Sequence, residues 1–124
     1  MISLNVMVVD DSAITIKKIT KLLTESGHKV VCSCDTGLKA VESYGEVKPD
    51  MITMDITMPD MDGITATRKI IEKYPEALII MVTSHGQQAM VLDAIKAGAK
   101  GYLLKPIKLE PLKQALDQII DKYV

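Results

Sequence analysis

The 124-residue chain contains no phenylalanine and no tryptophan, so its four tyrosines are its only aromatic side chains. Proteins that bind single-stranded nucleic acid stack bases on aromatic rings, and this composition provides no such platform. An excess of charge of either sign is also lacking, because the chain has 15 basic and 16 acidic side chains. An excess of basic residues is what draws a protein to nucleic acid or to an anionic membrane, so we expect neither partner.

Long hydrophobic runs are missing as well. The longest, residues 77–82, has the length of a strand, and the apolar residues 1–9 are followed at once by Asp10 and Asp11. A membrane span needs about 20 apolar residues, and a signal peptide needs a basic segment before its apolar one. We therefore expect no membrane insertion and a cytoplasmic protein.

Cysteine is scarce. Cys32 and Cys34 are separated by one residue in an expected strand, so both point to the same face of a sheet. A disulfide between them would be strained, and two thiols alone make a weak metal site. The pattern favours thiols that fill the core.

Apolar stretches of strand length alternate five times with amphipathic stretches of helical period. Buried strands joined by helices predict a parallel sheet covered on both faces, a single (βα)5 domain of the α/β class over residues 1–124. His28 is expected in a surface turn, and the methionines are expected to fill gaps in the core, with Met90 on the fourth helix a candidate for facing a partner instead. We expect strands over residues 4–9, 29–34, 51–55, 78–83 and 101–104, and helices from a cap at Ser12 to a stop at Gly27, over residues 36–44 with Gly45 as the end, and over residues 63–74, 86–97 and 109–123.

Polar side chains follow four of the expected strands: Asp10 and Asp11, Asp55, Thr83, and Lys105. The carboxyl ends of parallel strands share one edge of a sheet, so these groups should meet in one crevice. Two carboxylates about 4 Å apart repel by ~1 kcal/mol in water and ~4 kcal/mol near a protein surface, so the cluster needs a cation. Carboxylates suit Mg²⁺, and an aspartate beside a metal, an ammonium and a hydroxyl is equipped for phosphoryl transfer.

Four motifs occur in order: VVDD at residues 8–11, MDITMPDMDG at 54–63, VTS at 82–84 and KP at 105–106. With them the chain resembles the receiver domain of two-component response regulators, most closely the stand-alone, CheY-like type of chemotaxis systems. The resemblance runs from about Leu4 to the C-terminus. It implies a flavodoxin-like three-layer sandwich with the strand order 2-1-3-4-5 known for this family.

The resemblance also implies roles for the residues at the crevice. Asp55 is the phosphoacceptor, and Lys105, whose bond to Pro106 is expected cis, bridges to the phosphoryl group. Thr83 moves toward the phosphoryl oxygens, and Tyr102 turns inward as it does so. The implied ligands of Mg²⁺, for which Mn²⁺ can substitute, are oxygens of Asp10 (largely through water), Asp11, Asp55 and the backbone carbonyl of Thr57.

For function, the resemblance implies a regulator that promotes only its own phosphorylation and dephosphorylation and is not otherwise an enzyme. A sensor histidine kinase supplies the phosphoryl group and a phosphatase is a further partner. The face built by residues 86–97, 101–104 and 109–123 then binds an output protein, with the flagellar motor switch as the expected target. The unphosphorylated protein is expected to be a monomer.

Three alternatives use the same residues differently. A phosphorelay intermediate would pass the phosphoryl group on to a histidine phosphotransfer domain. A Mg²⁺-dependent phosphatase of the haloacid dehalogenase type would need a second aspartate where Thr57 stands, and a cap domain for which the chain is too short. A flavin carrier would need a phosphate-binding loop after the first strand. Asp10 and Asp11 stand there, and their negative charges would repel the phosphate of the flavin. Thr57, Ile56 and His85 depart from the best-known chemotaxis pattern, and positions 57 and 85 tune the lifetime of the aspartyl phosphate in the family.

Overall fold

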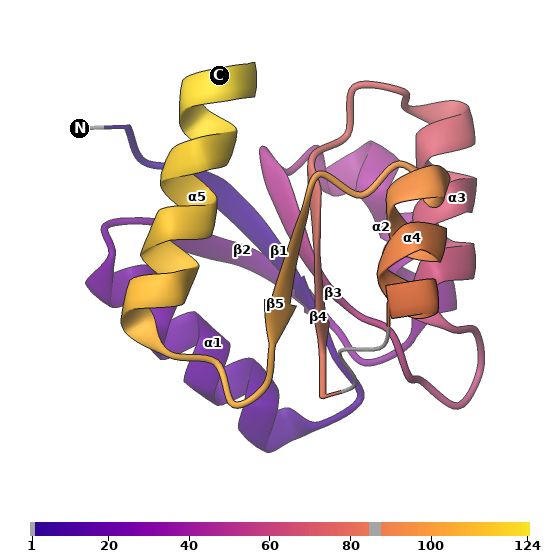
Figure 1. Ribbon diagram of the computed structural model, residues 1–124, viewed down its shortest axis with the longest axis horizontal. Helices are drawn as coiled ribbons and strands as arrows, with labels where there is room; N and C mark the ends of the chain where they lie inside the picture. The colour runs from indigo at the N-terminus through magenta and orange to yellow at the C-terminus, as the bar shows by residue number, and fades with distance from the viewer. Residues whose placement is uncertain (1, 85–87) are drawn as a thin grey trace.

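The computed structural model describes residues 2–84 and 88–124 and shows five parallel strands in the order β2-β1-β3-β4-β5 (Figure 1). The fold class and strand order expected from the sequence are confirmed. Within residues 2–84 and 88–124, every helix is too short or too polar to span a lipid bilayer. The elements are β1 (Asn5–Val9), α1 (Ala13–Glu25), β2 (Lys29–Cys34), α2 (Gly37–Val47), β3 (Met51–Asp55), α3 (Gly63–Lys73), β4 (Ile79–Thr83), α4 (Gln88–Ala97), β5 (Gly101–Leu104) and α5 (Leu109–Tyr123).

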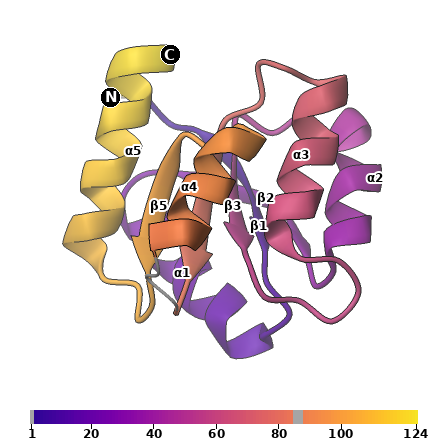
Figure 2. The same ribbon diagram turned by 45° about the vertical axis from the view of Figure 1, so that its right-hand side comes forward.

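Helices cover both faces of the sheet, which makes three layers. α1 and α5 lie on one face, and α2, α3 and α4 lie on the other (Figures 1 and 2). Every residue of β3 and β4 is buried, as expected for inner strands of a parallel sheet. The sheet thus separates two hydrophobic cores, which we call the α1/α5 core and the α2–α4 core.

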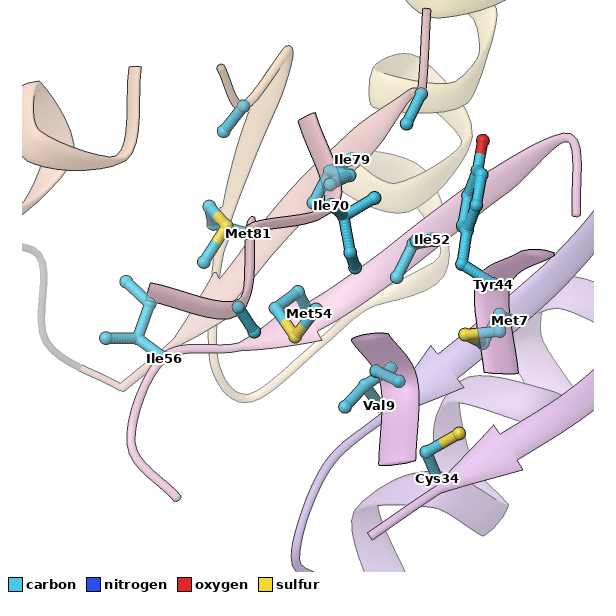
Figure 3. Packing of buried hydrophobic residues seen from close by; sticks show 14 of the residues in the cluster. Met7, Val9, Cys34, Tyr44, Ile52, Met54, Ile56, Ile70, Ile79 and Met81 are labelled. Carbon is cyan, nitrogen blue, oxygen red and sulfur yellow. The ribbon is translucent and has the colours of Figure 1, made fainter. Parts of the chain in front are cut away.

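Methionine takes much of the space that aromatic rings fill in other proteins. Met7, Met54 and Met81 are fully buried in the α2–α4 core, beside Ile52 and Ile79 (Figure 3). The hydroxyl of Thr67 lies 3.4 Å from Met81 Sδ and donates to it, so a buried polar group finds a partner within this core. Unbranched thioether side chains adapt to irregular gaps, and the expected core role is confirmed for Met7, Met51, Met54, Met58 and Met81.

The helix expected to stop at Gly45 instead continues to Val47, so that prediction is wrong. Its end is marked by Lys48, which has a left-handed backbone with φ of 49°. Gly45 serves packing: a Cβ at this position would collide with the hydroxyl of Tyr74, whose ring lies 4.6 Å from that of Tyr44. The expected helix start at residue 86, and His85, lie outside the described residues.

His28 was expected on the surface, and this expectation is also wrong. Its side chain is only 8% exposed, and its Nδ1 accepts a hydrogen bond of 3.0 Å from the backbone N–H of Leu4. The imidazole therefore joins the entry to β2 with the entry to β1. Burial lowers the pKa of His28, with the nearby Asp117 carboxylate opposing that shift.

Lowering the pH should therefore reduce the free energy of unfolding, because the folded state disfavours protonated His28. The unfolded histidine takes up a proton near pH 6.5, whereas the folded one resists it, so stability is lost as pH falls through that value. We expect His28→Gln to lose less stability than the wild type on acidification, measured as the change in free energy of unfolding between pH 7.5 and pH 5.5. Other groups titrate in both proteins, so their contributions cancel in the comparison. An equal pH dependence in the two proteins would contradict the assignment.

Candidate functional site

The acidic residues singled out in the sequence meet at the carboxyl edge of the sheet. Asp10 and Asp11 follow β1, and Asp55 is the last residue of β3, the neighbour of β1. Each offers one carboxylate oxygen, and these three oxygens all lie within 4.8 Å of one another. We call these three residues the acidic cluster.

Contacts and burial distinguish the three carboxylates. Asp10 is completely buried, Asp55 is 5% exposed and Asp11 is exposed. Asp10 Oδ1 accepts a hydrogen bond of 2.9 Å from the backbone N–H of Ser12, which begins α1 as its N-cap. Lys105 Nζ lies 2.9 Å from Asp10 Oδ2 and 3.3 Å from Asp55 Oδ1, so one ammonium contacts both buried carboxylates.

These surroundings alter the proton affinity of Asp55. Burial first, then the charge of Asp10, raises the pKa of Asp55 to about 6, against the opposing influence of Lys105. Burial alone would lower the pKa of Lys105, but its contacts with Asp10 and Asp55 raise it overall. At neutral pH Asp55 is therefore mostly ionised, and one ammonium, that of Lys105, lies among three carboxyl groups.

Magnesium fits this donor set. Carboxylate oxygens are the ligands that this hard cation prefers, and it usually takes one or two of them together with water or phosphate oxygens. Asp10 Oδ2 is buried and, within the described residues, accepts no well-directed hydrogen bond, although the ammonium is close. An exposed carboxylate, Asp11, completes the cluster on the solvent side.

The loop after β3 is fixed at both ends. Gly63 N–H donates to the carbonyl of Ile56 at 2.7 Å, and a Cβ on Gly63 would collide with the backbone of Asp55, so only glycine allows this close approach. Asp62 caps α3 by accepting from the backbone N–H of Thr65 at 2.9 Å. The loop therefore holds Asp55 against the start of α3.

Asp60 has a role that the sequence did not reveal. Its position in the sequence indicates only a turn residue, but its carboxylate accepts from the backbone N–H groups of Gly37 at 3.2 Å and Leu38 at 3.0 Å. Asp60, in the loop after β3, thereby accepts hydrogen bonds from the first two backbone N–H groups of α2. An aspartate that caps a distant helix has no local sequence pattern, so the signal exists only in the fold.

The other predicted site residues lie on β4, on β5 and in the loop after β3. Thr83 is the buried last residue of β4, and Tyr102 is a half-buried residue of β5. Thr57 is an exposed residue of the loop after β3. The peptide bond between Lys105 and Pro106 is cis, as expected.

Removing the ammonium should destabilise the metal-free protein. Lys105→Met leaves Asp10 and Asp55 buried without a counter-charge, and we expect a loss of about 1–3 kcal/mol in free energy of unfolding in chelator at pH 7.5. Saturating Mg²⁺ should recover most of the loss, because the cation supplies the missing charge. The matched control is Lys108→Met at an exposed position of the same loop, and equal stability of the two variants in chelator would refute the expectation.

Comparison with known proteins agrees with this geometry. The family model described as response regulator receiver domain matches residues 6–117. The chain belongs to this family. It is 44% identical over 115 residues to the chemotaxis protein CheY of Listeria monocytogenes, covering 93% of this chain and 97% of that protein, and 43% identical over 116 residues to CheY of Bacillus subtilis, covering 94% and 97%.

Among solved structures, the chain is similar to the crystal structure of a CheX–CheY–BeF3–Mg complex from Borrelia burgdorferi. The TM-score is 0.90 at 35% identity, and the alignment covers 94% of this chain and 88% of that one. The similarity to chemotaxis regulators along nearly their whole length makes this chain a CheY-like receiver domain, consistent with a response regulator of the chemotaxis type.

Proposed function

We propose that residues 1–124 act as one receiver unit that accepts a phosphoryl group on Asp55 and then binds an output protein. The observation that carries this proposal is the meeting of Asp10, Asp11 and Asp55 within 4.8 Å, with Lys105 in contact with two of them. A cluster of this kind is costly to keep, because its charges repel and two of its members are buried. Binding a cation and a phosphoryl group at this place would explain why these repelling carboxylates are kept together.

In the proposed reaction, a carboxylate oxygen of Asp55 attacks the phosphorus of the donor. The bond between phosphorus and the donor breaks, and the donor group leaves with the electron pair. The chain's own contribution is to orient Asp55 through the loop closed by Gly63 and to neutralise a phosphoryl oxygen with Lys105.

The proposed cation is Mg²⁺, held by Asp10, Asp11, Asp55 and the backbone carbonyl of Thr57, with Mn²⁺ as a substitute. When bound, it supplies positive charge that offsets the carboxylates and the phosphoryl oxygens. Asp10 contributes largely through water, since it already accepts from Ser12 and contacts Lys105.

Switching then follows from the added charge. A phosphoryl group brings about −1.5 to −2 charges and three acceptor oxygens, which draw the Thr83 hydroxyl toward Asp55. Tyr102 turns inward in response, and the face formed by α4, β5 and α5 changes shape. A pocket of about 360 Å³ lies beside Tyr102 on this face, and Ile95 and Leu104 are exposed there, which supports its use as a binding surface.

The proposed partners are a sensor histidine kinase as donor and, in chemotaxis, the flagellar motor switch as output target, with a phosphatase ending the signal. The unphosphorylated protein is proposed to be a monomer, and proteins of this type act as regulators rather than enzymes. A relay, in which the phosphoryl group passes to a histidine phosphotransfer domain, would use the same site but another partner.

A capture experiment from cell lysate tests the proposal. Beryllofluoride with Mg²⁺ imitates the phosphoryl group, so the immobilised protein is compared with and without it. We expect a flagellar motor switch protein to be enriched only in the beryllofluoride arm, and Asp55→Asn, treated in the same way, to show no enrichment. Enrichment of a histidine phosphotransfer protein instead would establish the relay, and identical capture in all arms would refute the switch.

A further inference from the structure

The two cysteines converge on one point at the edge of the sheet. The Sγ atoms of Cys32 and Cys34 lie 3.9 Å apart, and both thiols are free. Their register partners on β1 are Met7 and Val9, so both face the α2–α4 core, as Figure 3 shows for Cys34. Cys34 is buried, whereas Cys32 is half-buried beside it.

Strand geometry disfavours a disulfide here. Residues i and i+2 of a strand have Cα atoms about 6.6 Å apart, which is close to the upper limit of about 6.8 Å for disulfides. A single bridging atom suits the sulfurs better. Two metal–sulfur bonds of about 2.3 Å at a tetrahedral angle separate the sulfurs by about 3.8 Å, and a linear arrangement separates them by about 4.6 Å. The observed 3.9 Å corresponds to the tetrahedral case.

The electrostatics of the pair make ionisation of both thiols depend on a cation. Burial, followed by the neighbouring Cys32, raises the pKa of Cys34 to about 11, so the free thiol is a poor nucleophile. A buried thiolate pair without a cation would be unfavourable. A divalent cation that displaces two protons leaves a neutral unit, which is the form that a mostly apolar environment tolerates.

We propose that Cys32 and Cys34 form a two-sulfur binding site for a soft divalent cation of the Zn²⁺ and Cd²⁺ class. Each thiol releases its proton to solvent as one metal–sulfur bond forms, and nothing is oxidised or reduced. Water or a small thiol from solution occupies the remaining tetrahedral positions. The acidic cluster offers only hard oxygen ligands, so the two sites select different cations.

Titration of the reduced protein with Cd²⁺ tests this site, with Mg²⁺ in excess to protect the carboxylates. Thiolate-to-cadmium charge-transfer absorbance should saturate at one Cd²⁺ per chain, and both cysteines should become protected from a thiol reagent. Cys32→Ser and Cys34→Ala should each weaken binding by about 10-fold or more. Asp55→Asn is the matched control and should bind Cd²⁺ as the wild type does.

Three results would overturn the proposal: no charge-transfer band, one Cd²⁺ shared between two chains, or unchanged binding in a folded single variant. Circular dichroism establishes which variants are folded. If the change at buried Cys34 prevents folding, Cys32→Ser decides the matter, because that position is half-buried and its neighbours remain in place.

Discussion

Replacing Asp55 by Asn is expected to reduce phosphoryl incorporation from acetyl phosphate by about three orders of magnitude or more, the size of effect seen when a nucleophile is removed. The amide is close in shape to the carboxylate but lacks its nucleophilic charge. The measurement is radiolabel or mass increase on the intact protein in the presence of Mg²⁺. The expected result is a protein that stays folded and unmodified.

The structure gives reasons for choosing Asp55 over its neighbours. Asp10 Oδ1 accepts a hydrogen bond from the N–H of Ser12, and Asp10 Oδ2 is completely buried 2.9 Å from the Lys105 ammonium. Asp11 is exposed, and solvation weakens a nucleophile. Asp55 is nearly buried with its pKa raised to about 6, chiefly by burial, so it is ionised at neutral pH yet poorly solvated.

A matched variant separates this effect from a general change of charge. Asp62→Asn removes one negative charge from the loop after β3. It keeps a good N-cap for α3, since asparagine caps a helix as well as aspartate does. It should be labelled like the wild type. Label that persists in Asp55→Asn, on Asp10 or Asp11, would show that another carboxylate is the acceptor.

Removal of divalent cations is expected to reduce labelling by about a hundredfold or more, the scale of one missing electrostatic stabiliser in a transition state. Two charges separated by 4.8 Å at an effective dielectric constant of 20 repel by about 3–4 kcal/mol, and the cluster contains three such pairs. Lys105 offsets part of this repulsion. An incoming phosphoryl donor adds further negative charge, which Lys105 alone does not neutralise.

The experiment compares labelling in chelator with labelling after Mg²⁺ or Mn²⁺ is returned. Sodium chloride at the same ionic strength is the control, because general screening would act without a specific site. Recovery with Mg²⁺ or Mn²⁺ but not with sodium is the expected outcome. Full labelling in chelator would exclude a metal role for the acidic cluster.

The elements of the fold could be predicted closely from the sequence where apolar runs have sharp polar limits. β2, β3 and β5 begin and end where the pattern placed them. Gly45 misled the prediction because a glycine near a helix end usually stops it, whereas here it admits the Tyr74 hydroxyl. His28 misled it because the N–H that it accepts from, on Leu4, is distant in sequence.

The meeting of the acidic cluster with Lys105 could be anticipated because the carboxyl ends of parallel strands share one edge. The differences among its members could not. The complete burial of Asp10, the exposure of Asp11 and the position of Lys105 between two carboxylates depend on side-chain packing from several elements. The tie between Asp60 and α2 is of the same kind.

A core built on thioethers has a consequence for how the protein ages and how its motions can be followed. Met7, Met54 and Met81 have no exposed surface, so peroxide reaches their sulfur atoms only when the α2–α4 core opens. Conversion to the sulfoxide would then insert a polar group that the closed core has no room to accept. The rate at which dilute peroxide oxidises each of these methionines should therefore report how often the core opens at that residue. Peptide mass spectrometry measures this rate for each methionine.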